Sequence, residues 1–151
     1  ESIFQSLVGN SKNASAYVLK DGDKECPSQE NNKYALCLKL NCHESENLYL
    51  TDEVLTDMSL TWDQAKQKIK SEASKYGNKA QFLSEADTWD RKQVDLKNYI
   101  QELQEILDVK HVNWAMRLGR VIGSKKPEGQ LAEFLGEKVV NALWPETEKV
   151  N

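Results

Sequence analysis

Residues 84–107, SEADTWDRKQVDLKNYIQELQEIL, contain the longest regular pattern in the chain. Their apolar side chains recur at steps of seven, four, three and four residues, the spacing of one face of an α-helix; they are Trp89, Leu96, Ile100, Leu103 and Leu107. Ser84 can cap this helix, because a serine side chain accepts a hydrogen bond from a free backbone N–H in the first turn. We expect one long helix over residues 84–107, with the rest of the chain packed around it.

Three more helices are predicted beside this one. Residues 61–76 carry an apolar stripe at helical spacing, and Thr61 and Gln64 have the spacing of a capping box. Residues 110–122 form the next predicted helix. The last covers residues 127–144, because proline suits the first position of a helix and Pro127 precedes a run with helical periodicity. The pattern predicts a bundle of about four helices.

The N-terminal part has a different pattern. Residues 34–40 alternate between apolar and other side chains, which is typical of a half-buried strand. Residues 16–20 and 48–51 predict two shorter strands, and residues 2–8 a short helix. We expect the strands to form a small antiparallel sheet with one face against the helices, because sheets of this kind commonly leave one face in water.

Composition and length agree with a single α+β domain over residues 1–151, predominantly α. A strand and loop subregion is expected over 1–58, a helical bundle over 59–145 and a polar tail over 146–151. Apolar residues make up 39% of the chain and charged residues 29%, enough to bury a core and remain in solution. No apolar run approaches the length that a membrane span needs.

Three cysteines lie within a short polar segment, at Cys26, Cys37 and Cys42. Clustering of this kind favours one disulfide with one thiol left over, and free thiols are the alternative. A zinc site made from the cysteines and His43 is disfavoured, because their spacing lacks the paired C-x2-C of structural zinc sites. Since the chain starts at Glu1, we expect a removed leader or an excised fragment. A disulfide predicts a secreted, periplasmic or cell-surface location.

Residues 110–126 contain five cations and no acidic residue: Lys110, Arg117, Arg120, Lys125 and Lys126. A basic stripe beside Trp114 is a possible binding site for phosphate or nucleic acid. The preceding and following helices are acidic, however, and helices joined by short links are usually neighbours. We therefore expect the basic segment to be neutralised within the bundle and do not expect nucleic acid as the partner.

Motifs for catalysis are missing from the chain. It contains no nucleophile elbow, no H-E-x-x-H and no phosphate-binding loop. Carboxylates are plentiful, so a small hydrolase acting through them is an alternative; Glu85, Glu102 and Glu105 are nevertheless predicted on the solvated face of the long helix. Whether the protein is an enzyme stays open, with a non-catalytic role favoured.

The sequence therefore predicts a non-catalytic domain that binds another protein outside the cytosol, as an inhibitor, immunity, surface-recognition or assembly factor. We expect no cofactor and no metal. The recognition surface is expected in residues 25–47, because a polar loop held by a disulfide loses little entropy on binding. Its candidate binding residues are Gln29, Asn31, His43 and Glu44.

Overall fold

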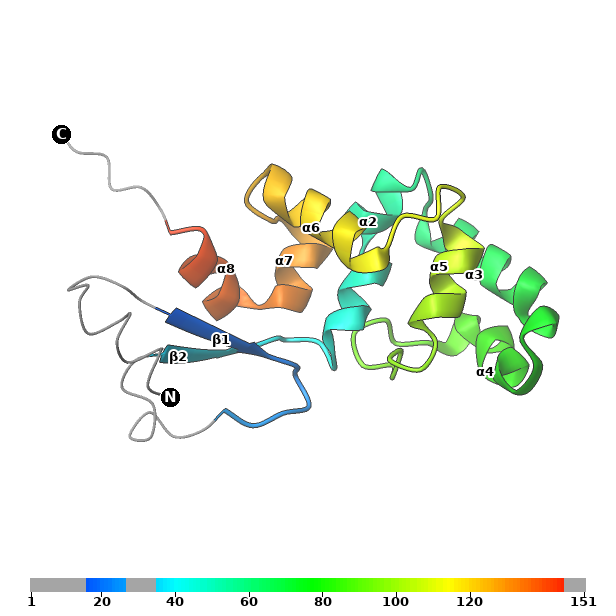
Figure 1. Cartoon of the computed structure of the whole chain (residues 1–151), viewed down its shortest axis with the longest axis horizontal. Coiled ribbons are helices and arrows are strands. Elements are labelled where there is room, and N and C mark those ends of the chain that lie inside the picture. Colours follow the sequence, from blue (N-terminus) through cyan, green and yellow to red (C-terminus); the bar gives the residue numbers. More distant parts are fainter. Residues whose placement is uncertain (1–15, 27–34, 146–151) are drawn as a thin grey trace.

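The computed structural model describes residues 16–26 and 35–145 (Figure 1). Two strands and the last helix lie at one end of the molecule, and the other helices extend from there to the opposite end. The predicted helix at residues 2–8, the predicted tail and the candidate binding residues Gln29 and Asn31 lie outside the described residues.

The predicted α+β class, predominantly α, is confirmed. The described residues contain a two-stranded sheet of β1 (Ala16–Lys20) and β2 (Ala35–Lys39). Their α-helices are α2 (Asp52–Asp57), α3 (Trp62–Glu72), α4 (Ala80–Ser84), α5 (Ile100–Leu107), α6 (Trp114–Ser124), α7 (Gly129–Leu135) and α8 (Glu137–Leu143). Short 3-10 helices are η2 (Ser45–Leu50), η3 (Ala73–Lys79) and η4 (Ala86–Thr88). The helices are thus shorter and more numerous than the four that were predicted.

The start of α3 follows the sequence closely. The Thr61 hydroxyl accepts from the Gln64 N–H at 3.3 Å, and the Gln64 side chain accepts from the Thr61 N–H at 2.9 Å. This capping box supplies partners for backbone groups that a helix end leaves free. Ala65 and Ile69, on the apolar stripe, are fully buried.

The predicted long helix over residues 84–107 is wrong. Helix α4 ends at Ser84, η4 occupies three residues, and the chain then runs without a regular helix until α5 begins at Ile100. The apolar residues of the stripe still reach the core, because Leu96, Leu103 and Leu107 are fully buried. Gln93, which lies within the stripe, is exposed. The periodicity therefore identified core residues correctly but assigned them to one helix instead of two segments.

Side chains from a distant segment explain the break. The Asn47 amide donates to the carbonyls of Arg91 and Val94, both at 2.8 Å, and the Glu44 carboxylate accepts from the Leu96 N–H at 2.5 Å. The His43 N–H also donates to the Lys92 carbonyl at 2.8 Å. These bonds satisfy backbone groups that a helix would have paired internally, so the loop is stabilised by tertiary contacts rather than by its own periodicity.

The last predicted helix, over residues 127–144, divides into α7 and α8. Gly136 separates them with a φ of +88°, a conformation that only glycine adopts readily. A Cβ at Gly136 would lie 3.1 Å from the Cβ of Asn41, so the position also permits a close approach to the segment that follows β2. Helix α6 begins at Trp114 rather than at residue 110, with Asn113 as its N-cap.

The predicted antiparallel sheet is also wrong, because β1 and β2 run parallel. Val18 pairs with Cys37 and Lys20 with Lys39. A parallel pair needs a connection of about a dozen residues or more, and residues 21–34 provide it. The turn at Asp21 does not fold back onto β1; it docks against residues 43–45, where the Asp21 carboxylate accepts from the Ser45 N–H at 2.8 Å.

The predicted third strand at residues 48–51 is a 3-10 helix, η2, followed by its C-cap. Leu48, Tyr49 and Leu50 are consecutive and all are buried. A strand on one side of a core would bury only alternate residues, so the short helix is the conformation that places all three inside.

Candidate functional site

A small sheet joined by a disulfide forms one end of the molecule (Figure 1). We call β1, β2 and the loop at residues 21–26 the tethered sheet, because Cys26 is bonded to Cys37 of β2. The predicted single disulfide is thus present, with Cys42 left as a free thiol. Lys39 on β2 also pairs with Glu25 of the loop at 3.5 Å. The loop is therefore attached to β2 by a covalent bond and an ion pair.

The tethered sheet exposes large apolar side chains to solvent. Tyr17, Val18 and Leu19 on β1 are 41%, 40% and 48% exposed, and Leu36 on β2 is 43% exposed. Successive residues of a strand point to opposite faces, so both faces of β1 present apolar surface. Such clusters on a small domain commonly mark a place where another molecule binds.

A short segment after β2 connects the sheet to the helices. The Leu40 N–H donates to the Lys20 carbonyl on β1, and the Asn41 N–H donates to the Phe134 carbonyl on α7, both at 2.9 Å. Gly22 packs so tightly here that a Cβ would collide with the carbonyl oxygen of Cys42. The orientation of the sheet is therefore set by backbone contacts with β1 and with α7.

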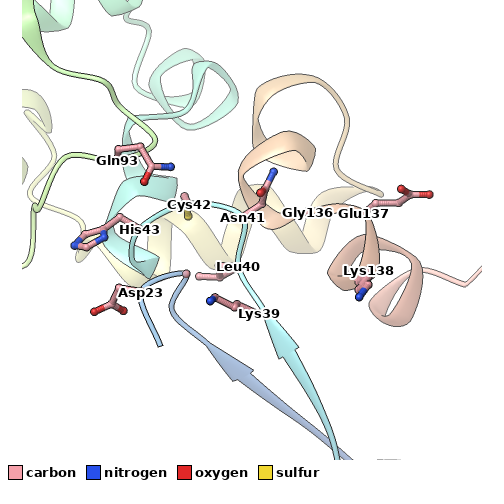
Figure 2. A pocket seen from close by; sticks show the side chains of 11 residues that line it. Asp23, Lys39, Leu40, Asn41, Cys42, His43, Gln93, Gly136, Glu137 and Lys138 are labelled. Atoms are coloured by element: carbon pink, nitrogen blue, oxygen red, sulfur yellow. The ribbon is translucent and has the colours of Figure 1, made fainter. Parts of the chain in front are cut away.

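A broad cavity of about 680 Å³ lies beside this segment (Figure 2). Most of its lining residues have polar or charged side chains: Asp23, Lys39, Asn41, His43, Gln93, Glu137 and Lys138. Figure 2 shows these side chains spread around the cavity, with Glu137 and Lys138 on the side opposite Asp23 and His43. The charges have mixed sign and do not converge on one point, an arrangement typical of a polar contact surface rather than of a reaction centre.

Cys42 has a structural environment. The residue is 1% exposed, and its thiol donates to the Glu44 carbonyl at 3.2 Å. Burial raises the pKa of the Cys42 thiol to about 12. A cysteine nucleophile reacts as the thiolate, so this neutral, buried thiol is unsuited to nucleophilic chemistry.

The described candidate binding residues differ in their surroundings. His43 is half-buried and lines the cavity near Asp23, whose N–H donates to the His43 carbonyl at 3.1 Å. Glu44 is only 5% exposed, and its carboxylate caps the loop at Leu96. Burial raises the pKa of this carboxyl above its ordinary value. The structure therefore places His43 where a partner could reach it and Glu44 inside the fold.

The central cation of the basic segment is buried. Arg117 on α6 is 2% exposed and forms ion pairs with Asp57 at the end of α2 and with Asp108 after α5. Its Nε donates to Asp108 Oδ2 at 2.7 Å. The expected internal neutralisation of the basic segment therefore holds for Arg117, which offers no surface to an anion.

The other cations of the segment lie on the surface. Lys110 and Lys126 are exposed, and Arg120 and Lys125 line a shallow groove of about 600 Å³ between α2 and α6. Three carboxylates share that groove: Asp52, Glu53 and Asp57. The groove combines both signs of charge, which is a poor match for the continuous negative charge of a phosphate backbone.

One glutamate of the predicted solvated face is partly buried. Glu102 Oε1 accepts from Lys79 Nζ at 2.6 Å, and Glu102 Oε2 is enclosed without a hydrogen-bond partner. The prediction that Glu102 faces solvent is therefore wrong, because η3 packs its lysine over this part of α5. Glu85 and Glu105 are exposed, as expected.

A zinc site from the cysteine cluster is incompatible with this arrangement, because Cys26 and Cys37 are bonded to each other. Within residues 16–26 and 35–145, no group of three or more His, Cys, Asp or Glu is placed to hold a metal ion. Among the helices of the described residues, none is long and apolar enough to cross a membrane.

The exposed apolar residues of β1 were not among the predicted binding residues, although the sequence contained a signal. Residues 16–19 are four consecutive apolar residues, and a small sheet with only one face against the helices would leave half of them in water, because successive side chains of a strand point to opposite faces. Comparison with known protein families, with characterised proteins and with solved structures finds no match for the chain.

Proposed function

We propose that the chain is a non-catalytic domain that binds another protein outside the reducing cytosol, and that the tethered sheet is its recognition surface. The observation that carries this proposal is the exposure of Tyr17, Val18, Leu19 and Leu36 on a sheet that is covalently attached to its own loop. A preformed surface of this kind loses little conformational entropy when a partner binds.

The composition of the surface supports a protein partner. Protein interfaces commonly have an apolar centre surrounded by polar residues that remain in contact with water. The strands supply the apolar centre, and Asp23, His43 and Lys39 lie around the adjoining cavity. Tyrosine is enriched in such interfaces because its ring is large and carries a polar group, which makes Tyr17 the first candidate for a major contact.

The disulfide supports a location outside the cytosol. Disulfides persist in oxidising compartments and are rare where glutathione and thioredoxin keep thiols reduced. The protein is isolated from its natural source and unfolded in the presence of a thiol-alkylating reagent, without reductant. The proposal predicts that only Cys42 is alkylated. Labelling of Cys26 and Cys37 in the same sample would contradict the proposed location.

Binding is tested with a pair of variants that each remove exposed apolar surface at two positions. The first carries Tyr17→Ser and Leu19→Ser in the tethered sheet. The control carries Val109→Ser and Met116→Ser, residues of the helical part that are 80% and 67% exposed. The unmodified chain and both variants are immobilised and exposed to the extracellular or periplasmic fraction of the source, and the bound proteins are compared.

The expected result is a partner that the unmodified chain and the helical control retain and that the sheet variant loses. Since all four side chains are exposed, each variant should keep its urea midpoint, which excludes unfolding as the cause. His43→Ala should weaken binding of the same partner, by a smaller factor than the sheet variant does. If the sheet variant retains the partner and the helical control loses it, the recognition surface lies on the helices and the assignment to the sheet is wrong.

A further inference from the structure

The outer edge of β1 carries backbone groups with no partner among the described residues. The Lys20 carbonyl accepts from the Leu40 N–H, so the backbone N–H and C=O groups of Lys20 point toward β2. The backbone groups of alternate residues in a strand point in the same direction. The N–H and C=O groups of Val18 therefore also face β2, while those of Tyr17 and Leu19 face away from it. An edge of this kind is a ready template for another strand.

The two edges of the sheet are not equivalent. On β2, the backbone groups that point away from β1 belong to Cys37 and Lys39 and, beyond the strand, to Asn41. The Asn41 N–H donates to the Phe134 carbonyl, and α8 packs against β2. Near the end of β2, this outer side thus lies toward α7 and α8. Among the described elements, β1 packs chiefly against β2 and not against a helix, so its outer edge is the more accessible of the two.

Natural edge strands usually carry a device against pairing, such as an inward-pointing charge, a proline or a bulge. β1 has no proline, and its single charge is at its last residue. That charge is directed to the loop, where Lys20 Nζ donates to the Glu25 carbonyl at 3.0 Å. Within residues 16–26 and 35–145, the edge of β1 is therefore apolar and carries none of these devices, as expected of a strand that pairs with another chain.

We propose that β1 pairs antiparallel with β1 of a second copy of this chain, on a two-fold axis through Val18. The proposal rests on the proposed function, since it takes the tethered sheet as the binding surface and names its partner. In this register Tyr17 of one copy lies opposite Leu19 of the other, and these are the residues whose backbone groups face outward. Each such pair can exchange both of its N–H···O=C bonds.

A two-fold interface requires a surface that is complementary to itself. β1 meets this requirement in its charges as well as in its backbone. Lys20 lies opposite Ala16 of the second copy, so the two lysines do not face each other. Val18 meets Val18 on the axis, in the closely spaced type of pair where apolar side chains contact best. The product is a continuous four-stranded sheet in which β1 and its copy are central.

The register predicts a specific pattern of charge variants. Val18→Lys and Val18→Glu each place two like charges opposite one another on the axis, so each should raise the dimer dissociation constant by about tenfold or more. An equimolar mixture of the two places a lysine opposite a glutamate and should restore association. Met116→Lys adds the same charge at an exposed site on α6 and serves as the control.

The measurement is the mass of the full chain in solution, by sedimentation velocity over a series of micromolar concentrations, with circular dichroism as the check on folding. We expect the unmodified chain and the control to approach twice the mass of 17.2 kDa, each Val18 variant to sediment as a monomer, and the mixture to return to the dimer. A monomeric unmodified chain, or a mixture that stays monomeric, would overturn the pairing.

Failure of this inference can be distinguished from failure of the proposed function. A chain that stays monomeric but captures a different protein through Tyr17 and Leu19 overturns the second-copy assignment and leaves the recognition surface in place. A dimer with the expected charge pattern supports the pairing whether or not the extracellular fraction yields a further partner.

Discussion

Replacing Arg117 with methionine should destabilise the fold by about 3–5 kcal/mol, because it leaves a buried carboxylate without its counter-ion. The side chains of Arg117 and Asp108 are each only 2% exposed, and the guanidinium Nη2 lies 2.6 Å from Asp108 Oδ2. Methionine keeps most of the apolar stem of arginine, so the decrease in the free energy of unfolding reports mainly on removal of the charge.

The neighbouring ion pair provides the internal comparison. The Asp57 side chain is 30% exposed, so Asp57→Asn should cost about 1 kcal/mol or less, as for partly solvated pairs. The double variant Arg117→Met with Asp108→Asn removes both buried charges. The side-chain amide oxygen that this change introduces can still accept from the Lys110 N–H, a bond that Asp108 makes at 2.9 Å. The double variant should therefore be more stable than Arg117→Met alone, by about 1–3 kcal/mol.

The assay is urea unfolding followed by far-UV circular dichroism. For a slope of about 2 kcal/mol per molar urea, the Arg117→Met midpoint should fall by about 1.5–2.5 M. A loss below about 1 kcal/mol would show that the guanidinium is solvated. An equal loss in the single and double variants would show that the effect comes from packing and not from the unpaired carboxylate.

Three further predictions concern the core, the free thiol and a buried carboxyl. Ile100→Ala should cost about 2–5 kcal/mol, whereas Gln101→Ala, exposed on the same helix, should stay within about 0.5 kcal/mol in the same urea assay. Cys42 should resist iodoacetamide in the folded protein and react in urea without reductant, as intact mass would show; reaction before unfolding would contradict its burial. Burial raises the pKa of the Glu44 carboxyl in the folded protein. The contribution of this carboxyl to the free energy of unfolding is therefore fully present below pH 4.5, and it is lost as the pH rises through the raised pKa. Glu44→Gln should remove this decline from the pH profile, and an unchanged profile would contradict it.

Local patterns predicted the helix class and several helix boundaries. The capping box at Thr61 depends on residues three positions apart, and it formed as expected. The apolar spacing in residues 84–107 identified Leu96, Leu103 and Leu107 as core. These predictions succeeded because they rest on interactions within a few residues of one another, or on the burial of apolar side chains, which any compact fold must satisfy.

The long helix failed because its backbone had better partners elsewhere. Residues 90–98 include two aspartates and one asparagine, which favour turns. The Asp90 carboxylate accepts from the Lys92 N–H at 2.9 Å. Asn47 and Glu44, more than 40 residues earlier, then bond the loop. Helical periodicity in a sequence does not reveal such distant partners.

At the candidate site, too, the sequence predicted some features and only tertiary contacts decided others. Clustering of the cysteines predicted one disulfide, but the pairing of Cys26 with Cys37 depends on Cys42 being turned into the core beside η2. Polarity was the signal that predicted the binding residues. Polarity does not indicate the exposed apolar side chains Tyr17 and Leu19, and apolar residues in a strand usually predict a core.

The sequence alone determined the α+β class, the helical preponderance, the disulfide-forming cluster and the core residues Leu96, Leu103 and Leu107, since composition and short-range spacing specify these. Only the tertiary structure decided that the strands run parallel, that residues 89–99 form a loop and that Arg117 is neutralised by Asp57 and Asp108. Each of these depends on hydrogen bonds and ion pairs between segments far apart in the chain. Which backbone groups and charges meet is settled when the helices pack, and no local pattern encodes it.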